Sequence, residues 1–172
     1  MGGISANTSS YILYGTSGFL TVNAVDLGAT LGDISLEMAT EEYYPDLAQA
    51  RGPLVGTGKI VGASGKITVT LAEWNFAVLK TLFSSGYSSD ASSEVIGSGA
   101  LGTITELNNV VITGLDRNDG KAFVATIPYA RVTSPIATTL AETSESGIEI
   151  TFEALFTAAA PATMPIWVKF EV

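Results

Sequence analysis

The chain of 172 residues contains no cysteine and no histidine. Without cysteine it cannot build a disulfide framework, a thiolate metal site or a cysteine nucleophile. Without histidine it lacks the most common general base, the most common zinc ligand and the usual pH switch. We therefore predict that the protein uses no metal and no cofactor.

Basic residues are also scarce, with 8 Lys and Arg against 17 Asp and Glu and a formal net charge of −9. A chain this acidic repels phosphates and has no basic stripe, so we expect no specific binding of nucleic acid. No run of 18 apolar residues is present, which argues against membrane insertion. The first residues have no basic and apolar signal pattern, so synthesis and assembly in a cytoplasm are expected. The mean hydropathy of +0.37 is high, which predicts apolar contacts between subunits; the alternative is a well-filled sandwich core that takes up the apolar excess.

None of the candidate motifs has the complete set of residues that a catalytic or ligand-binding site needs. Gly56–Lys59 and Gly62–Lys66 are rich in glycine but lack the spacing and the following Ser or Thr of a phosphate-binding loop. Asp116–Lys121 begins like a calcium loop but has Gly and Lys where further ligands are needed. No pair of carboxylates is set apart by its spacing. We predict that the protein is not an enzyme.

The residues favour a mainly β fold, an antiparallel sandwich or barrel. Asp33–Met38 alternates with period two, which predicts that Ile34, Leu36 and Met38 are buried and that the intervening side chains face water. Ile148–Phe156 alternates in the same way, with Glu149, Thr151 and Glu153 on the polar side. The low content of charge and the many Thr, Val and Ile residues agree with this class.

Other segments complete the predicted organisation. Phe19–Val25 is expected as a strand after a glycine turn, and Thr103–Thr113 as a strand interrupted at Asn108 and Asn109. Lys121–Thr133 is expected as a long strand in which Pro128 marks a bulge or an edge. Residues 1–10 are expected to form a flexible arm, and residues 11–172 a single domain.

One flanking helix is predicted over Leu71–Phe83. Thr70 and Glu73 have the spacing of a capping box at its start. Apolar residues recur at helical spacing, which is typical of a helix packed across a sheet. These residues are Leu71, Trp74, Val78, Leu79, Leu82 and Phe83.

A long loop is predicted over Thr40–Gly58, and we interpret it as a contact surface. Unstructured connections of this length are uncommon and are often functional, and Tyr and Arg are enriched at interface hot spots. The alternative is a solvated loop whose tyrosines pack back on their own domain. The candidate contact residues are Glu41, Glu42, Tyr43, Tyr44, Pro45 and Arg51.

The order of these elements resembles that of bacteriophage major tail tube proteins. Three stretches carry the resemblance: Ile34–Glu42 at the entry to the loop, Gly65–Phe83 from strand to helix, and Gly147–Phe156 near the end. The resemblance spans the whole chain but rests on architecture, because no diagnostic motif is present.

The resemblance implies a β-sandwich or barrel subunit that forms hexameric rings. The rings would stack into a virion tail tube, assembled in the host cytoplasm, whose lumen passes DNA without binding it specifically. Partners would be copies of the chain itself and other tail proteins at the tube ends. Glu37, Glu149, Thr151 and Glu153 are our candidate lumen residues; the alternative is that they face bulk solvent outside. The alternative functions are a monomeric or low-order binding module, such as a decoration protein or an adhesin, and a secretion-tube protein.

Overall fold

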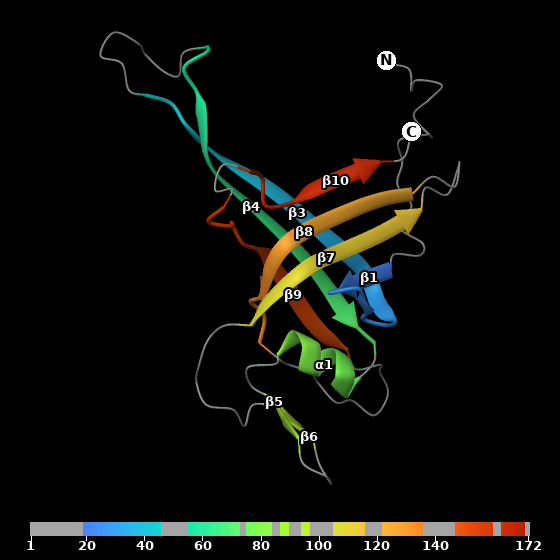
Figure 1. Cartoon of the computed structure of the whole chain (residues 1–172). Coiled ribbons are helices and arrows are strands. Elements are labelled where there is room, and N and C mark those ends of the chain that lie inside the picture. The colour runs from blue at the N-terminus through green and yellow to red at the C-terminus, as the bar shows by residue number, and fades with distance from the viewer. Residues whose placement is uncertain are drawn as a thin grey trace, which may run out of the picture.

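A computed structural model describes residues 19–45, 55–72, 75–83, 87–89, 94–96, 105–115, 122–135, 147–159 and 163–170. These residues form ten strands and one helix (Figure 1), which confirms the mainly antiparallel β prediction with one flanking helix. The elements are β1 (Phe19–Val22), β2 (Val25–Asp26), β3 (Thr30–Tyr43), β4 (Lys59–Leu71), α1 (Phe76–Leu82), β5 (Tyr87–Ser89), β6 (Glu94–Ile96), β7 (Glu106–Leu115), β8 (Ala122–Val132), β9 (Ile148–Ala154) and β10 (Trp167–Phe170).

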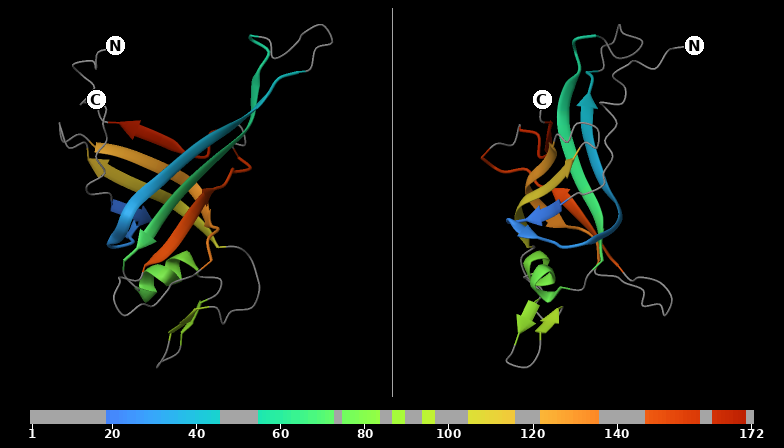
Figure 2. Two further views of the ribbon diagram at one scale, coloured as in Figure 1. Left: turned by 180° about the vertical axis from the view of Figure 1, so that it is seen from behind. Right: turned by 90° about the vertical axis from the view of Figure 1, so that its right-hand side faces the viewer.

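Eight strands form one antiparallel sheet in the order β2-β1-β7-β8-β9-β4-β3, and β10 pairs with β8. The first half of β8 pairs with β10, and its last residues pair with β9. The sheet folds over at β8, so that β1, β7 and β10 lie in one layer and β9, β4 and β3 in the other (Figure 2). Among the described residues, β5 and β6 form a separate two-stranded sheet.

The fold-over is built from a paired irregularity in β7 and β8. Asn109 has a φ of 51°, and Pro128, which would lie opposite it, has no N–H to donate. Buried residues on both strands are therefore three apart rather than two: Leu107 and Val110 on β7, Ile127 and Ala130 on β8. The sequence predicted that Pro128 marks either a bulge or an edge strand. Pro128 marks an irregularity in the pairing, and β8 is an interior strand rather than an edge.

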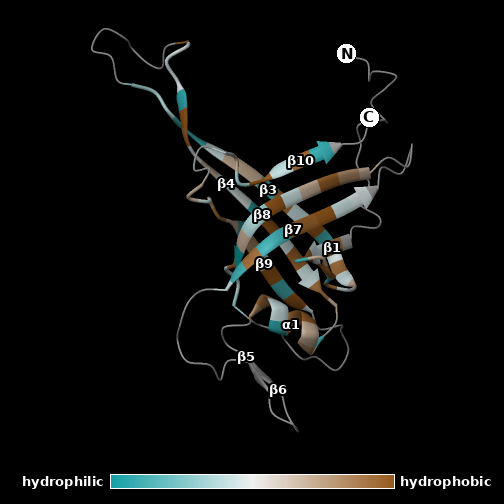
Figure 3. Ribbon diagram, viewed as in Figure 1, coloured by the Kyte–Doolittle hydropathy of each residue, from teal (hydrophilic) through white to brown (hydrophobic). Residues whose placement is uncertain are grey.

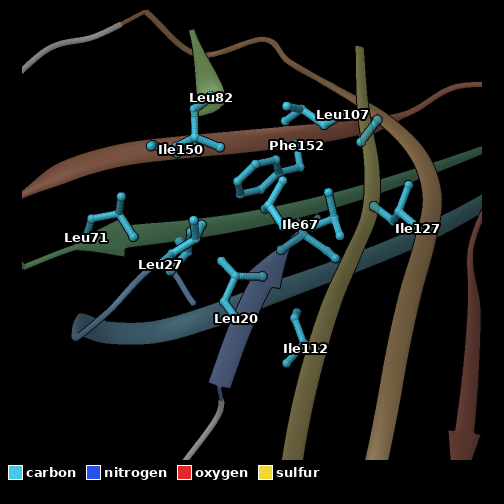
Figure 4. Close-up of a cluster of buried hydrophobic side chains, with 14 of the residues drawn as sticks. Leu20, Leu27, Ile67, Leu71, Leu82, Leu107, Ile112, Ile127, Ile150 and Phe152 are labelled. Atoms are coloured by element: carbon cyan, nitrogen blue, oxygen red, sulfur yellow. The ribbon is translucent and has the colours of Figure 1, made fainter. Parts of the chain in front are cut away.

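The core lies between the two layers and is closed at one end by α1. Apolar side chains from both layers meet there (Figure 4), and Figure 3 shows apolar residues alternating with polar ones along the strands. The predicted alternation of β9 is confirmed, since Ile148, Ile150 and Phe152 are fully buried. The largest buried side chains are Phe152, Leu20, Leu27, Ile67, Leu71, Leu79, Leu82, Leu107, Ile127, Ile148, Ile150 and Ile166.

The helix is shorter than predicted and begins later. Its N-cap is Asn75, whose side-chain oxygen accepts a hydrogen bond of 3.0 Å from the backbone N–H of Ala77. The predicted capping box at Thr70 is wrong, because Thr70 and Leu71 pair with β9 as the last residues of β4. Pairing in the sheet thus outweighs the local helix signal. Val78, Leu79 and Leu82 form the buried face, as expected, while Glu73 and Trp74 lie outside the described residues.

The segment predicted as the loop Thr40–Gly58 is largely the end of a β-hairpin. β3 continues to Tyr43, which pairs with Lys59 at the start of β4. The connection is thereby reduced to Tyr44–Gly58, of which residues 46–54 lie outside the described residues. From Lys59 to Leu71 the chain is one continuous strand.

The N-terminal strand prediction also needs correction. Phe19–Val25 is divided by a turn at Asn23 and Ala24, which have φ values of 52° and 63°. The side chain of Asn23 accepts a hydrogen bond from the backbone of Asn108, and its own N–H donates to the carbonyl of Asn108. The predicted arm of residues 1–10 lies outside the described residues.

Candidate functional site

The hairpin of β3 and β4 extends beyond the rest of the fold and forms what we call the arm, residues 36–45 and 55–65. β9 pairs with β4 only from Lys66 to Leu71, so the arm from Met38 and Gly65 outward has no strand beside it within the described residues. Tyr43 lies five positions beyond Met38, which pairs with Gly65. At about 3.4 Å per residue, the paired tip lies roughly 17 Å beyond the level of Met38, and Figures 1 and 2 show this projection.

The arm carries apolar side chains that the chain itself leaves in water. Leu36 and Met38 were predicted to be buried, but they are 37% and 45% exposed. The prediction fails because β3 is the last strand of its sheet among the described residues, and from Met38 onward it also runs beyond the pairing of β4 with β9. Seven of the thirteen large apolar residues that are exposed in the described chain belong to the arm: Leu36, Met38, Tyr43, Tyr44, Val55, Ile60 and Val61.

The predicted contact residues lie at the tip of this arm. Tyr43 and Tyr44 are 55% and 41% exposed, so neither is covered by the body of the protein. The ring of Tyr44 lies over Gly58, where a Cβ atom would approach it to 2.5 Å. The Tyr44 hydroxyl donates a 3.1 Å hydrogen bond to Glu42. This bond and the negative charge of Glu42 raise the pKa of Tyr44 above its usual value.

The other predicted contact residues are placed less fully. Glu41 is exposed and pairs with Gly62 just before a bulge in the hairpin. Pro45 follows the tip and is half-buried. Arg51 lies outside the described residues. The structure thus gathers Glu41 to Pro45 at one end of the arm.

The predicted lumen residues lie together on the solvent side of the layer formed by β9, β4 and β3. We call this surface the polar face. In register across the strands, Glu37 of β3 is next to Lys66 of β4, and Lys66 is next to Glu153 of β9. Glu153 is in turn next to Arg131 of β8, whose Nε and Nη2 atoms donate hydrogen bonds of 2.9 and 2.7 Å to its carboxylate. Beyond it lies Glu106 of β7.

These five residues form a row of alternating charge. Each base in the row lies between two carboxylates, and the row has three acids and two bases, for a net charge of −1. We missed Lys66, Arg131 and Glu106 in the sequence. Their relation to Glu37 and Glu153 depends on the pairing order of five strands, which no local pattern reveals.

A row of hydroxyl groups runs beside the charged row. Ser35, Thr68 and Thr151 are neighbours across β3, β4 and β9, and the hydroxyls of Thr68 and Thr151 are 3.2 Å apart. The N–H of Thr151 donates to Ser134 Oγ at 2.9 Å. Glu149 is exposed at the far end of the same face, next to Thr70. The polar face therefore offers neutral hydroxyl groups and a small excess of negative charge.

A shallow apolar groove lies near the fold-over of β8. It encloses about 80 Å³ and is bordered by exposed aromatic and thioether side chains of Tyr129, Phe156 and Met164, with exposed Trp167 next along the chain on β10. Sequence analysis missed this groove because its walls come from three separate segments. The lining residues are Pro128, Tyr129, Leu155, Phe156, Thr157, Thr163, Met164 and Pro165.

The described residues contain no group of three or more Asp or Glu side chains placed to hold a metal ion. Within the same ranges, no helix has the length and apolar character needed to span a bilayer. The surfaces that remain as candidates for function are the arm, the polar face and the apolar groove.

No protein-family model and no curated protein sequence matches the chain. Among solved structures, the fold is similar to a chain from the virion of a native gene transfer agent particle, with a TM-score of 0.52 and 11% sequence identity. The match covers 94% of this chain and 100% of the other. The chain and this virion component share a fold.

Proposed function

We propose that the protein is a structural component of a phage-like virion, and specifically that it assembles into hexameric rings stacked as a tail tube. The observation that carries the proposal is the arm. Seven exposed apolar side chains on a projecting hairpin are costly in water and are typical of a surface covered by another protein. The shared fold with a chain of a virion particle supports the same role.

The edge of the sheet also supports self-assembly. β3 is 14 residues long and is the last strand of its sheet, so one side of its backbone has no strand partner among the described residues. Long open edges invite further pairing, and a closed ring of subunits removes them. A ring would therefore bury the apolar side chains of the arm and give hydrogen-bond partners to the backbone groups beside them.

We propose that the polar face lines the lumen and lets DNA pass without holding it. A phosphate that approaches Lys66 or Arg131 meets carboxylates on both sides of each base. Coulomb repulsion from these acids cancels much of the attraction to the base. The wall is thus mildly acidic, with each base set between acids, and its hydroxyl row keeps it wet.

The remaining features of the proposal follow from this role. The protein would act in the virion tail after assembly in the host cytoplasm, with other tail proteins at the tube ends. It would need no cofactor and perform no catalysis.

Sedimentation velocity over a concentration series tests the assembly. We expect hexamers or larger species that increase with concentration. A monomer at every concentration would contradict the proposal and favour the binding module.

The lumen assignment has its own test. In particles that carry Glu149→Lys, we expect tubes of normal length and slower genome ejection at low salt, because the new cation meets no flanking carboxylate in register. Ala77→Lys, at an exposed position on α1, is the control and should eject normally. Normal ejection by both variants would show that Glu149 does not line the lumen.

A further inference from the structure

We propose that the apolar groove of one subunit receives the arm tip of a second copy of the chain. This inference rests on the proposed self-assembly and identifies the two surfaces that meet. The occupant would be the segment around Tyr43 and Tyr44, and the receiving walls would be Tyr129, Phe156 and Met164.

The distribution of exposed apolar residues leads to this pairing. Eleven of the thirteen large apolar residues exposed in the described chain belong to only two surfaces. Seven lie on the arm, and four lie in or beside the groove. Val25 and Phe76 are the two that lie elsewhere. Because the arm and the groove are both apolar and both exposed to water, contact between them would bury the apolar surface of each.

The arm cannot reach the groove of its own chain. The antiparallel ladder fixes the hairpin from Thr30 to Tyr43, and the tip lies roughly 17 Å beyond the level of Gly65. Gly65 itself lies against Ile166, which comes just before β10 and directly after Pro165 of the groove. The groove is therefore at the base of the arm, and contact between tip and groove requires a second molecule.

Charge favours the same partner. Glu41 and Glu42 lie at the apolar tip and form no ion pair within the described ranges; with Lys59, which pairs with Tyr43, they give the described tip a net charge of −1. Lys169 is exposed on β10, two residues beyond Trp167, and likewise has no ion-pair partner in the part of the chain that the structure describes. An acidic tip that docks beside a lysine gains attraction and has its register fixed.

Such a contact is head-to-tail, since the arm and the groove are different surfaces. Each subunit uses its arm on one neighbour and offers its groove to the other. Contacts of this kind generate a closed ring or an open filament rather than a symmetric dimer. The pairing thus supplies the geometry that a ring needs.

Cysteine cross-linking tests the pairing, and the chain offers no background because it has no native cysteine. One variant carries Val55→Cys, at a fully exposed position near the arm tip, and a second carries Thr163→Cys in the groove. The two are mixed, assembled and treated with a short bis-maleimide. We expect a cross-link between the two variants in the mixture and at least tenfold less in either variant alone. Glu149→Cys, on the polar face, replaces the groove variant in the control and should not link to the arm.

The outcomes separate this inference from the proposed function. Assemblies that form without an arm-to-groove link, or that link arm to arm, overturn the inference and leave self-assembly intact. A protein that never assembles overturns both.

A second measurement does not depend on the added cysteines. Phe156→Glu with Met164→Glu should weaken self-association at least tenfold, whereas Phe76→Glu, similarly exposed on α1, should leave it unchanged. Circular dichroism confirms that each variant is folded. Equal association by the folded groove variant and the control would also refute the docking site.

Discussion

Replacing Tyr43 and Tyr44 together by alanine should abolish assembly and leave a folded monomer. The two side chains are 55% and 41% exposed in the single chain, and an aromatic side chain presents about 150–250 Å². Together they leave roughly 190 Å² in water, and burial of this area at about 25 cal/mol/Å² sets an upper limit of about 5 kcal/mol per contact.

The measured loss should be smaller than this limit. Part of the tyrosine surface is polar, and the alanine that remains still buries some area. Interface hot spots cost about 2–4 kcal/mol when truncated, so each subunit contact should weaken roughly 30- to 1,000-fold. Because every subunit of a ring uses the same contact, a loss of this size removes the ring at micromolar concentration.

Sedimentation velocity and circular dichroism measure assembly and folding of this double variant. Val25→Ala is the matched control, since Val25 is exposed at 42% on β2 and belongs to neither surface. Unimpaired assembly of the folded tyrosine variant would show that the arm tip is not a contact and would refute the reasoning.

Four further changes test the structure itself. Gly65→Ala places a Cβ atom 2.5 Å from the Ile166 side chain and should destabilise the fold by about 1–3 kcal/mol, measured by urea unfolding. Asn75→Ala removes the N-cap of α1 and should lower the free energy of unfolding by about 1 kcal/mol in the same assay. Arg131→Met breaks a partly exposed ion pair and should cost less than about 1 kcal/mol, with a difference that shrinks as salt is added. Glu42→Gln replaces the charged acceptor of the Tyr44 hydrogen bond, and this bond and the negative charge of Glu42 raise the pKa of Tyr44, so absorbance titration should show a lower tyrosine pKa; an unchanged titration would show that the interaction with Glu42 is absent in solution.

The sequence predicts well those features that depend on local period. The alternation of Ile148–Phe152 places the buried and polar sides of β9 correctly, because one face of that strand packs on the opposite layer. The class of the fold follows from several such strands. The buried face of α1 was also predictable from the spacing of Val78, Leu79 and Leu82.

Features that depend on pairing between distant segments were not predictable in this way. Thr70 looks like a helix cap until β9 pairs with it, and Leu36 and Met38 look like core residues until β3 proves to be an edge. The charge row and the groove each combine residues from at least three segments. Their members are separated by tens of residues in sequence, so only the fold brings them together.

Electron microscopy of the purified, untagged protein at high concentration tests the central claim most directly. We predict sixfold rings that stack into tubes, with the strands β3, β4 and β9 turned to the channel and each arm on the neighbouring subunit. Single compact particles at every concentration, in which the arm contacts no second copy of the chain, would contradict this claim.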